Sequence, residues 1–300
     1  MALLQWPQEN AHDPDPRIRF FSAPESNLVL DFHGDPAHSG LTVFSDGNHH
    51  MALEAAIREF ATINPKVGDV FYTTTPPAPL VAAAKGHGLM VGNLHLNVQP
   101  DIFIGPENII SNLATDGLVS RHAPFVQSRG NVLLVRKHNP KNIHSVSDLL
   151  SDSVRLTCSN PQTEKASFEV YREAAINMAN QADAATEDLV EKLSGSSEST
   201  VHSQVIHHRE VPQIIADDKA DAAIIYYHLA LRYTRIFPDI FDLVDVQDNL
   251  ANNRPEAGPI TQYHIGIVNQ KSSWSEAFYE FMQHSVATEI YEYHGLSALH

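Results

Sequence analysis

Residues 41–60 read LTVFSDGNHHMALEAAIREF and contain one complete strand–turn–helix unit. An apolar strand over 41–44 is predicted to end in the Ser-Asp-Gly-Asn turn. Apolar residues then recur at Leu53, Ile57 and Phe60, which is the spacing of an amphipathic helix. The stretch therefore predicts a strand whose carboxyl end opens directly onto the start of a helix.

The turn itself contains residues suited to binding. Asp46 or Asn48 can cap the helix, and Gly47 permits a tight turn. Free N–H groups at a helix start favour an anion, and ligands of open α/β sheets bind where strands end. An ordinary capped turn without a ligand is the alternative. The same arrangement recurs along the chain, which favours the ligand-binding interpretation.

Further strands alternate with helices through the rest of the chain. They are predicted over residues 67–73, 100–105, 131–137, 154–159, 222–227, 241–246 and 264–268. Such alternation with short linkers is typical of parallel sheets covered by helices. Breaks near 118–133 and 250–265 indicate two lobes joined by two crossings. The predicted division is an N-terminal extension 1–40, lobe 1 over 41–130 plus 267–300, and lobe 2 over 131–266.

Composition narrows the possible partners. The formal net charge is −16, which argues against nucleic acid or an anionic membrane surface. The single cysteine, Cys158, excludes an internal disulfide and a cysteine-rich metal or iron–sulfur site. The longest apolar run, 222–231, is too short for membrane insertion. The first residues do not resemble a secretory signal, so the expected location is the cytoplasm, or the periplasm if a signal peptide has been removed.

Seven motifs, in order along the chain, resemble those of the type II periplasmic solute-binding proteins. They are most similar to the molybdate-binding component of ABC transporters, over roughly residues 41–296. The motifs are TVFSDGNHHMALEAAIREF, DVFYTTTPPAPL, PDIFIGPENIISNLATDGLV, NVLLVRKHNPKNIHSVSDLL, RLTCSNPQTEKASFEVYREAA, ADAAIIYYHLAL and EIYEYHGLSAL. The resemblance implies an α/β, two-lobed type II periplasmic-binding-protein fold. Each lobe would be a mainly parallel sheet covered by helices, with the ligand cleft between the lobes.

The resemblance also implies a function. Proteins of that family hold a small oxyanion with hydroxyls and backbone N–H groups, without a full counter-charge, and release it unchanged. We therefore expect binding of a molybdate- or tungstate-like oxyanion, for ABC-type uptake or for sensing. No enzyme activity and no cofactor are expected, and an ABC transporter permease is the expected protein partner. The positions that match the family's ligand contacts are Asn48, Thr74, Thr75, Lys165, Ala166, Val205 and Tyr226, with Arg209 as an added charge.

Two departures from the family pattern leave alternatives open. A carboxylate, Asp46, stands in the first turn, where it would repel a bound dianion. The segment before the Tyr226 strand is rich in charge and imidazole. The same fold could therefore bind a transition metal or metal chelate instead. The candidate ligands are His49, His50, His207, His208 and Glu210, with Asp46.

A third alternative is an enzyme on this fold. The sequence contains no Gly-x-Ser-x-Gly elbow, no His-Glu-x-x-His motif and no glycine-rich phosphate loop. Only His208 and Glu210 offer a possible acid–base pair. A cytoplasmic sensor that passes a conformational change to a partner is a further alternative.

Overall fold

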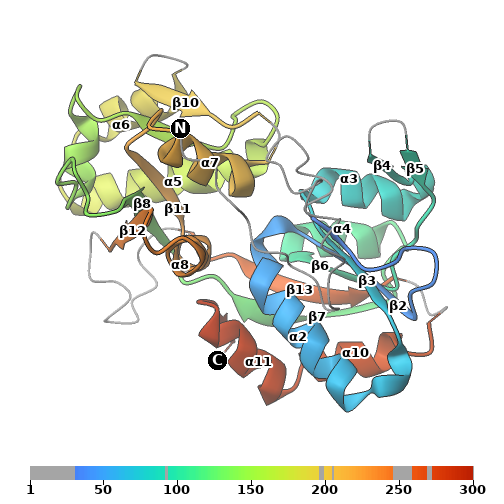
Figure 1. Cartoon of the computed structure of the whole chain (residues 1–300). Coiled ribbons are helices and arrows are strands. Elements are labelled where there is room, and N and C mark those ends of the chain that lie inside the picture. Colours follow the sequence, from blue (N-terminus) through green and yellow to red (C-terminus); the bar gives the residue numbers. More distant parts are fainter. Residues whose placement is uncertain are drawn as a thin grey trace. The chain divides into compact units, whose positions relative to one another are not determined.

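The computed structural model describes residues 31–91, 94–195, 199–204, 206–245, 259–268 and 272–299. The chain forms two compact units, each built on one main sheet (Figure 1). The first unit contains the described residues of 7–127 and 261–300, and the second unit contains those of 128–260. Among the helices of the described ranges, none combines the length and apolar character needed to span a bilayer.

A seven-stranded sheet forms the centre of the first unit, in the order β1-β3-β2-β6-β13-β7-β14. Its strands are β1 (Phe32–His33), β2 (Leu41–Ser45), β3 (Val70–Thr74), β6 (Ile102–Pro106), β7 (Arg121–Gln127), β13 (Gln262–Ile267) and β14 (Ser297–Ala298). Strands β3, β2 and β6 are parallel, whereas β13 runs antiparallel to both of its neighbours, β6 and β7. A separate hairpin pairs β4 (Leu89–Val91) with β5 (Leu94–Leu96). The carboxyl ends of β2, β3 and β6 therefore meet at one edge of the sheet.

Helices cover both faces of this sheet. Val43 of β2 packs in a cluster with residues of three helices, α2 (His50–Ile63), α10 (Ser275–Met282) and α11 (Ser285–Tyr293). The next residue, Phe44, packs on the other face with α3 (Pro77–Ala82) and α4 (Glu107–Thr115). Shorter helical turns are η3 (Gly47–His49), η4 (Pro65–Val67) and the π-helical η5 (Ala83–His87). Burial on both faces explains why β2 is apolar without alternation.

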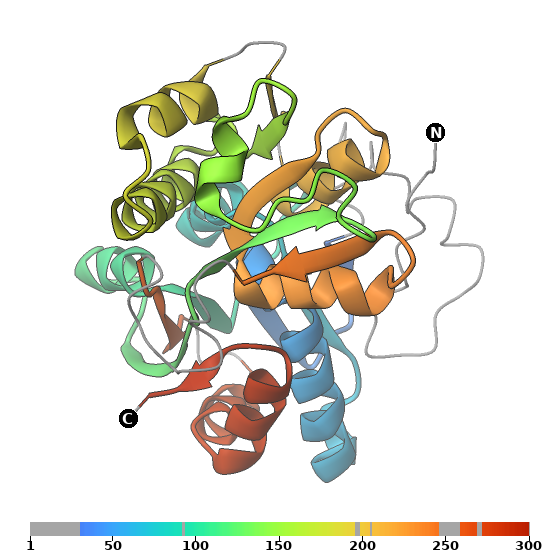
Figure 2. The ribbon, with the colours of Figure 1, turned by 90° about the vertical axis from the view of Figure 1, so that its left-hand side faces the viewer.

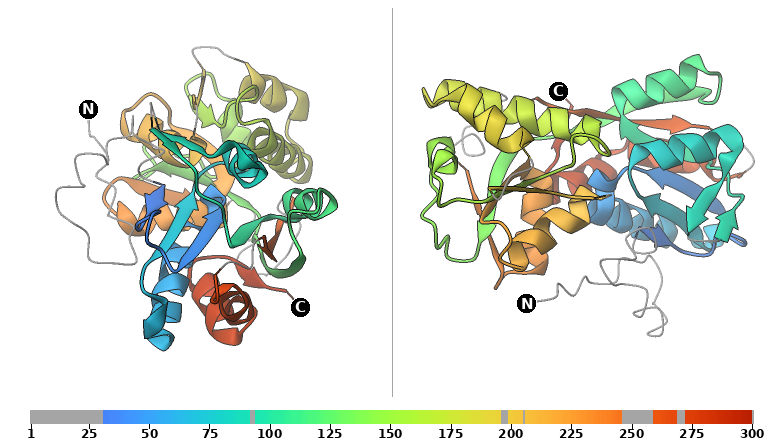
Figure 3. Two further views of the ribbon diagram at one scale, coloured as in Figure 1. Left: turned by 90° about the vertical axis from the view of Figure 1, so that its right-hand side faces the viewer. Right: turned by 90° about the horizontal axis from the view of Figure 1, so that it is seen from above.

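The second unit contains a five-stranded sheet in the order β10-β9-β11-β8-β12. Its strands are β8 (Asn131–Arg136), β9 (Leu156–Cys158), β10 (Thr200–His202), β11 (Ala222–Tyr226) and β12 (Phe241–Val244). Its helices are η6 (Val146–Leu150), α5 (Lys165–Gln181), α6 (Thr186–Ser194), α7 (His207–Ala216) and α8 (Tyr227–Ile236). Helices α5 and α6 lie together on one side of this sheet and α7 and α8 on the other (Figures 2 and 3). Since β8 is antiparallel to β11, the start of β8 lies at the edge where β9 and β11 end.

The predicted α/β architecture is confirmed, with three differences. Each sheet mixes parallel and antiparallel pairs and is not mainly parallel, because β13 and β8 enter from crossings and run against their neighbours. Strand β13 lies in the sheet of the first unit, so the chain returns at 260/261, ahead of the predicted 266/267. Residues 31–33, placed by the sequence in an extension, contribute to β1 and pair with β3. Hydrophobic pattern alone identifies a strand without saying which sheet it joins.

An aspartate organises the start of η6 and provides a first prediction. Asp148 accepts hydrogen bonds from the backbone N–H groups of His144 and Ser145, at 2.9 and 2.8 Å, and from the Ser145 hydroxyl at 2.9 Å. The backbone bond from His144 makes the largest contribution to lowering the pKa of Asp148. Asp148→Asn is expected to reduce the free energy of unfolding at pH 7 by about 1 kcal/mol.

The pH dependence follows from the direction of that shift. Because the folded pKa lies below the unfolded one, the contribution of Asp148 is complete above pH ~4 and is lost as the pH falls through the folded pKa. Urea titrations at pH 7 and pH 3 should therefore show a smaller difference between Asp148→Asn and wild type at the lower pH. Asp152→Asn, an exposed neighbour, serves as the control. Equal losses at both pH values would contradict this account.

Candidate functional site

In the first unit, the turn after β2 is organised around Asp46. Its carboxylate is buried, its Oδ1 accepts the N–H of Asn48 at 2.9 Å, and the same atom lies 3.5 Å from His49 Nε2. The backbone N–H of Asp46 donates to the Ile104 carbonyl at 3.2 Å, which fixes the turn against β6. The Asn48 N–H, predicted as an anion donor, is thus already bound to a carboxylate. The half-buried Asn48 side chain remains a predicted contact.

The ring of His49 lies in the aromatic core and not at an open site. It is fully buried, and its centroid lies 6.0, 4.5 and 5.7 Å from those of Phe125, Tyr263 and Tyr291. This packing explains its presence at the start of α2 and does not support the predicted metal role. The side chain of the other candidate, His50, lies outside the described part of the chain.

The two predicted threonines at the end of β3, Thr74 and Thr75, differ in their contacts. The Thr74 hydroxyl donates to Asp31 Oδ1 at 3.2 Å and lies 3.4 Å from His33 Nε2, so strand β1 already engages it. Thr75 follows β3 and is fully buried, and no hydrogen-bond partner of its hydroxyl exists within the described ranges. Of the two predicted hydroxyls, Thr75 is therefore the one that lacks a hydrogen-bond partner in the described residues.

In the second unit, hydrogen bonds clamp the loop before α5 to the loop before α7. Asn160 Oδ1 accepts the N–H groups of Gln162 and Thr163, and Asn160 Nδ2 donates to the Ser203 carbonyl at 3.0 Å. The Thr163 hydroxyl donates to the Gln204 carbonyl at 2.9 Å. These hydrogen bonds hold the two loops together at the edge of the sheet where the sequence predicts ligand contacts.

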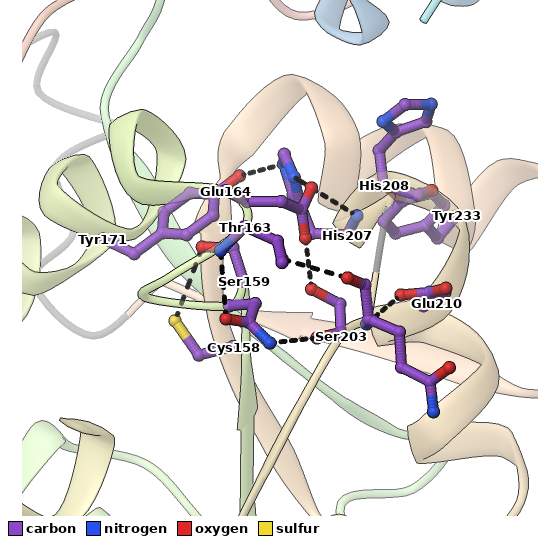
Figure 4. Close-up of polar contacts among 12 residues, drawn as sticks. Cys158, Ser159, Thr163, Glu164, Tyr171, Ser203, His207, His208, Glu210 and Tyr233 are labelled. Atoms are coloured by element: carbon purple, nitrogen blue, oxygen red, sulfur yellow. Dashed lines mark hydrogen bonds and ion pairs between the residues drawn. The ribbon is translucent and has the colours of Figure 1, made fainter. Parts of the chain in front are cut away.

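A buried carboxylate completes this clamp (Figure 4). Glu164 accepts a short hydrogen bond from the Ser203 hydroxyl, and its Oε1 accepts both the backbone N–H of His207 and its Nδ1, each at 2.8 Å. His207 Nε2 lies 3.1 Å from the Tyr171 hydroxyl. Burial opposes ionisation of Glu164, but the bonds from His207 and Ser203 outweigh it and lower the pKa of Glu164. The carboxylate is therefore ionised at neutral pH and held at the start of α5.

These contacts contradict the metal alternative for the second unit. Both ring nitrogens of His207 contact protein groups. His208 is buried beside it, and Glu210 accepts the backbone N–H of Gln204. In the described residues, no group of three or more His, Cys, Asp or Glu side chains could hold a metal ion. Sequence adjacency suggested a cluster, but the start of α7 directs these side chains into separate contacts.

The remaining predicted contacts of the second unit fall in different environments. Lys165 and Ala166 are exposed in the first turn of α5, where backbone N–H groups have no partner inside the helix. Arg209, predicted as an added charge for the ligand, is only 1% exposed on α7. Tyr226 is buried at the end of β11, with its ring 5.4 Å from that of Tyr171. Val205 lies outside the described residues.

One candidate was missed by the sequence analysis. Asn131 begins β8, pairs with Tyr226 in the sheet and is 3% exposed, and neither side-chain amide atom has a hydrogen-bond partner in the described part of the chain. Its signal in the sequence is a polar residue at the start of the otherwise apolar NVLLV run. From the sequence alone, this pattern could not be distinguished from that of a polar strand-end residue exposed to water.

Helix α8 adds two buried titratable groups. Burial lowers the pKa of His228 to about 3, so this ring is neutral at pH 7. Burial also lowers the pKa of Arg232 to about 10, which still leaves the guanidinium charged at pH 7. The second unit thus contains a permanent positive charge inside its core.

Comparisons with solved structures agree with this architecture. Peb3 from Campylobacter jejuni, crystallised with L-phospholactate, matches with 17% identity, a TM-score of 0.62, and coverage of 86% of this chain and 100% of Peb3. The sulfate-binding protein SubI from Mycobacterium tuberculosis H37Rv matches with 18% identity, a TM-score of 0.61, and coverage of 87% and 88%. The periplasmic molybdate-binding protein of Azotobacter vinelandii matches with 14% identity, a TM-score of 0.59, and coverage of 87% and 100%. These similarities establish the two-lobed type II binding-protein fold.

A family model supplies the classification. No curated protein sequence matches the chain. The model described as bacterial extracellular solute-binding protein matches residues 41–297, which include every described strand of both main sheets except β1 and the last residue of β14. The chain therefore belongs to the family of bacterial extracellular solute-binding proteins.

Proposed function

We propose that this protein binds a small oxyanion of the molybdate, tungstate or sulfate type and delivers it to an ABC-type permease. The observation that carries the proposal is that two buried polar side chains at strand ends, Thr75 in the first unit and Asn131 in the second, have no hydrogen-bond partner among the described residues. Leaving a buried polar group unsatisfied costs roughly 1–3 kcal/mol. An oxyanion can accept a hydrogen bond from a threonine hydroxyl or from an asparagine amide, and would remove that cost at the edge where it binds.

The local charges of the protein favour binding of an anion over binding of a cation. The net charge of −16 provides no long-range attraction for an anion, so binding must rely on local groups. Arg209 and Arg232 are buried cations of the second unit, and the N-terminus of the 17-residue helix α5 adds a partial positive charge. The Glu164 carboxylate opposes them, but its oxygens already accept hydrogen bonds from His207 and Ser203.

The names of the three similar structures described above support the same chemical class. Molybdate, sulfate and the phosphate group of L-phospholactate are all oxyanions. We therefore propose this class without choosing among its members. The contacts of His49 and His207 give the metal alternative no support, and we propose no catalytic activity.

Thermal unfolding of chelator-treated protein tests the proposal. Molybdate, tungstate, sulfate, phosphate and L-phospholactate would be added separately, with potassium chloride at matched ionic strength as the control. A ligand at ~100 times its Kd adds about 2.7 kcal/mol to the free energy of unfolding. For a protein of this size we expect the midpoint to rise by ~5–10 °C. The rise should persist from pH 7.5 to 5.5, because no histidine ring with a free nitrogen is proposed as a contact.

Two results would overturn the proposal. One is the absence of any shift with all five anions at millimolar concentration. The other is a shift produced by divalent transition metals and by none of the anions.

A further inference from the structure

Two histidines outside the proposed binding edges lie in direct contact in the first unit. His122 is on β7 and His264 on the neighbouring strand β13, and their Nδ1 atoms are 3.0 Å apart. The ring centroids are separated by 5.2 Å with an interplanar angle of 38°. The register between β7 and β13 shifts next to His264, between Tyr263 and His264. Such bulges redirect side chains and are common beside functional sites.

A third residue determines which nitrogen carries the proton. His264 Nε2 lies 3.3 Å from the side-chain oxygen of Gln262, which can only accept. His264 Nε2 is therefore the protonated nitrogen, and its Nδ1 carries a lone pair. His122 Nδ1 must then donate to His264 Nδ1. One proton thus lies between the two Nδ1 atoms, and both present a lone pair once His122 carries its proton on Nε2 instead.

The groups around His122 and His264 favour the neutral form of the two rings, which can bind a cation. Burial lowers the pKa of His264, and the neighbouring His122 lowers it further, while the charge of Glu107 at the start of α4 acts in the opposite direction. His122 is half-buried, so the pair is open to ions from solution. On the other side of β13 the residue paired with His264 is Gly105, which places no side chain beside the ring.

We propose that His122 and His264 bind a divalent transition metal ion, Zn²⁺, Ni²⁺ or Cu²⁺, through their Nδ1 atoms. Two imidazole nitrogens at ~2.0–2.1 Å from a tetrahedral metal are ~3.3 Å apart, close to the distance found here. The metal takes the place of the shared proton as His122 changes tautomer: Nδ1 gives its proton to solvent and Nε2 takes one from solvent, so the ring stays neutral and no proton is lost overall. Water completes the coordination, since the described residues supply no third His, Cys, Asp or Glu ligand. Gln262 holds His264 in the required tautomer, as groups behind metal-bound histidines commonly do.

Isothermal titration calorimetry with Zn²⁺ at pH 7.5 tests the site on the full chain. Wild type should bind one equivalent that is lost, or weakened at least about 10-fold, in His122→Gln and in His264→Gln. Gln262→Leu should weaken binding about 10-fold while leaving both ligands present. His284→Gln removes an exposed histidine of the same unit and is the control. Affinity should also fall as the pH drops below ~6.5, because protons compete for the ring nitrogens.

Three outcomes would overturn this proposal. They are wild type that takes up no Zn²⁺, binding retained by both His122→Gln and His264→Gln, and an equal loss in the His284→Gln control. His122 is half-buried, so His122→Gln keeps the test valid if His264→Gln fails to fold. None of these outcomes bears on oxyanion binding, which involves other residues.

Discussion

A Glu164→Gln variant is expected to lose about 3 kcal/mol of unfolding free energy at pH 7, the largest stability effect that we predict. Glu164 accepts three hydrogen bonds, from the Ser203 hydroxyl and from the backbone N–H and Nδ1 of His207. An amide in its place has one oxygen to accept them and presents an NH₂ group to other donors. The substitution thus leaves buried donors without acceptors and separates the loop before α5 from the loop before α7. Urea unfolding followed by circular dichroism measures the loss.

The same carboxylate predicts the acid sensitivity of the second unit. Burial raises the pKa of Glu164, but the hydrogen bonds and charge of its partners lower it more, so the folded pKa lies below the unfolded value. Its stabilising contribution is therefore complete above the unfolded value near ~4.3, and is lost as the pH falls through the folded pKa. Unfolding of Glu164→Gln should depend less on pH than that of wild type across this window.

An exposed glutamate on the same helix provides the control. Glu169 contacts Arg172 at 2.8 Å on the surface of α5, and such pairs contribute little. Glu169→Gln should change the free energy of unfolding by less than about 0.5 kcal/mol. If Glu164→Gln were as stable as Glu169→Gln and kept the pH dependence of wild type, Glu164 would not stabilise the two loops as described.

Asn131→Leu and Thr75→Val each test one sheet edge, and the variant at the edge that holds the oxyanion identified in the thermal panel is expected to weaken its binding by ~10–100-fold. Each variant removes one proposed hydrogen bond to a charged ligand, which is worth roughly 1.5–3 kcal/mol. Without ligand, the same variants should be as stable as wild type or more stable by about 1 kcal/mol, because they remove a buried polar group that has no partner. Calorimetric titration with that anion and thermal unfolding of the ligand-free protein measure the two effects. Weaker binding without lower stability is the signature of a ligand contact.

Thr74→Val is the matched control for Thr75→Val. The Thr74 hydroxyl already donates to Asp31, so its removal should cost stability in the ligand-free protein. Its effect on anion affinity should be smaller than that of Thr75→Val. The reverse order of affinities, or a loss of stability in both Asn131→Leu and Thr75→Val, would show that these side chains have structural roles.

The sequence by itself determined the order and type of the main elements. The 41–60 stretch forms β2, η3 and α2 as predicted, because apolar periodicity and a polar turn are local properties. The two-unit division followed from breaks in that pattern. Site residues were harder to predict, and Thr75 was distinguished from Thr74 only through β1, a strand that lies some 40 residues away.

Tertiary structure decided the partners of the polar side chains. The adjacent histidines at 49–50 and 207–208 suggested a metal site, yet His49 packs among aromatic rings and His207 bonds to Glu164 and Tyr171. The His pair that does meet, His122 and His264, lies 142 positions apart in the chain. A residue's type and its neighbours in sequence determine what it can bind, but only the folded sheet determines which group reaches it. Residues far apart in the sequence can meet in the structure, because strand pairing joins segments from opposite ends of the chain.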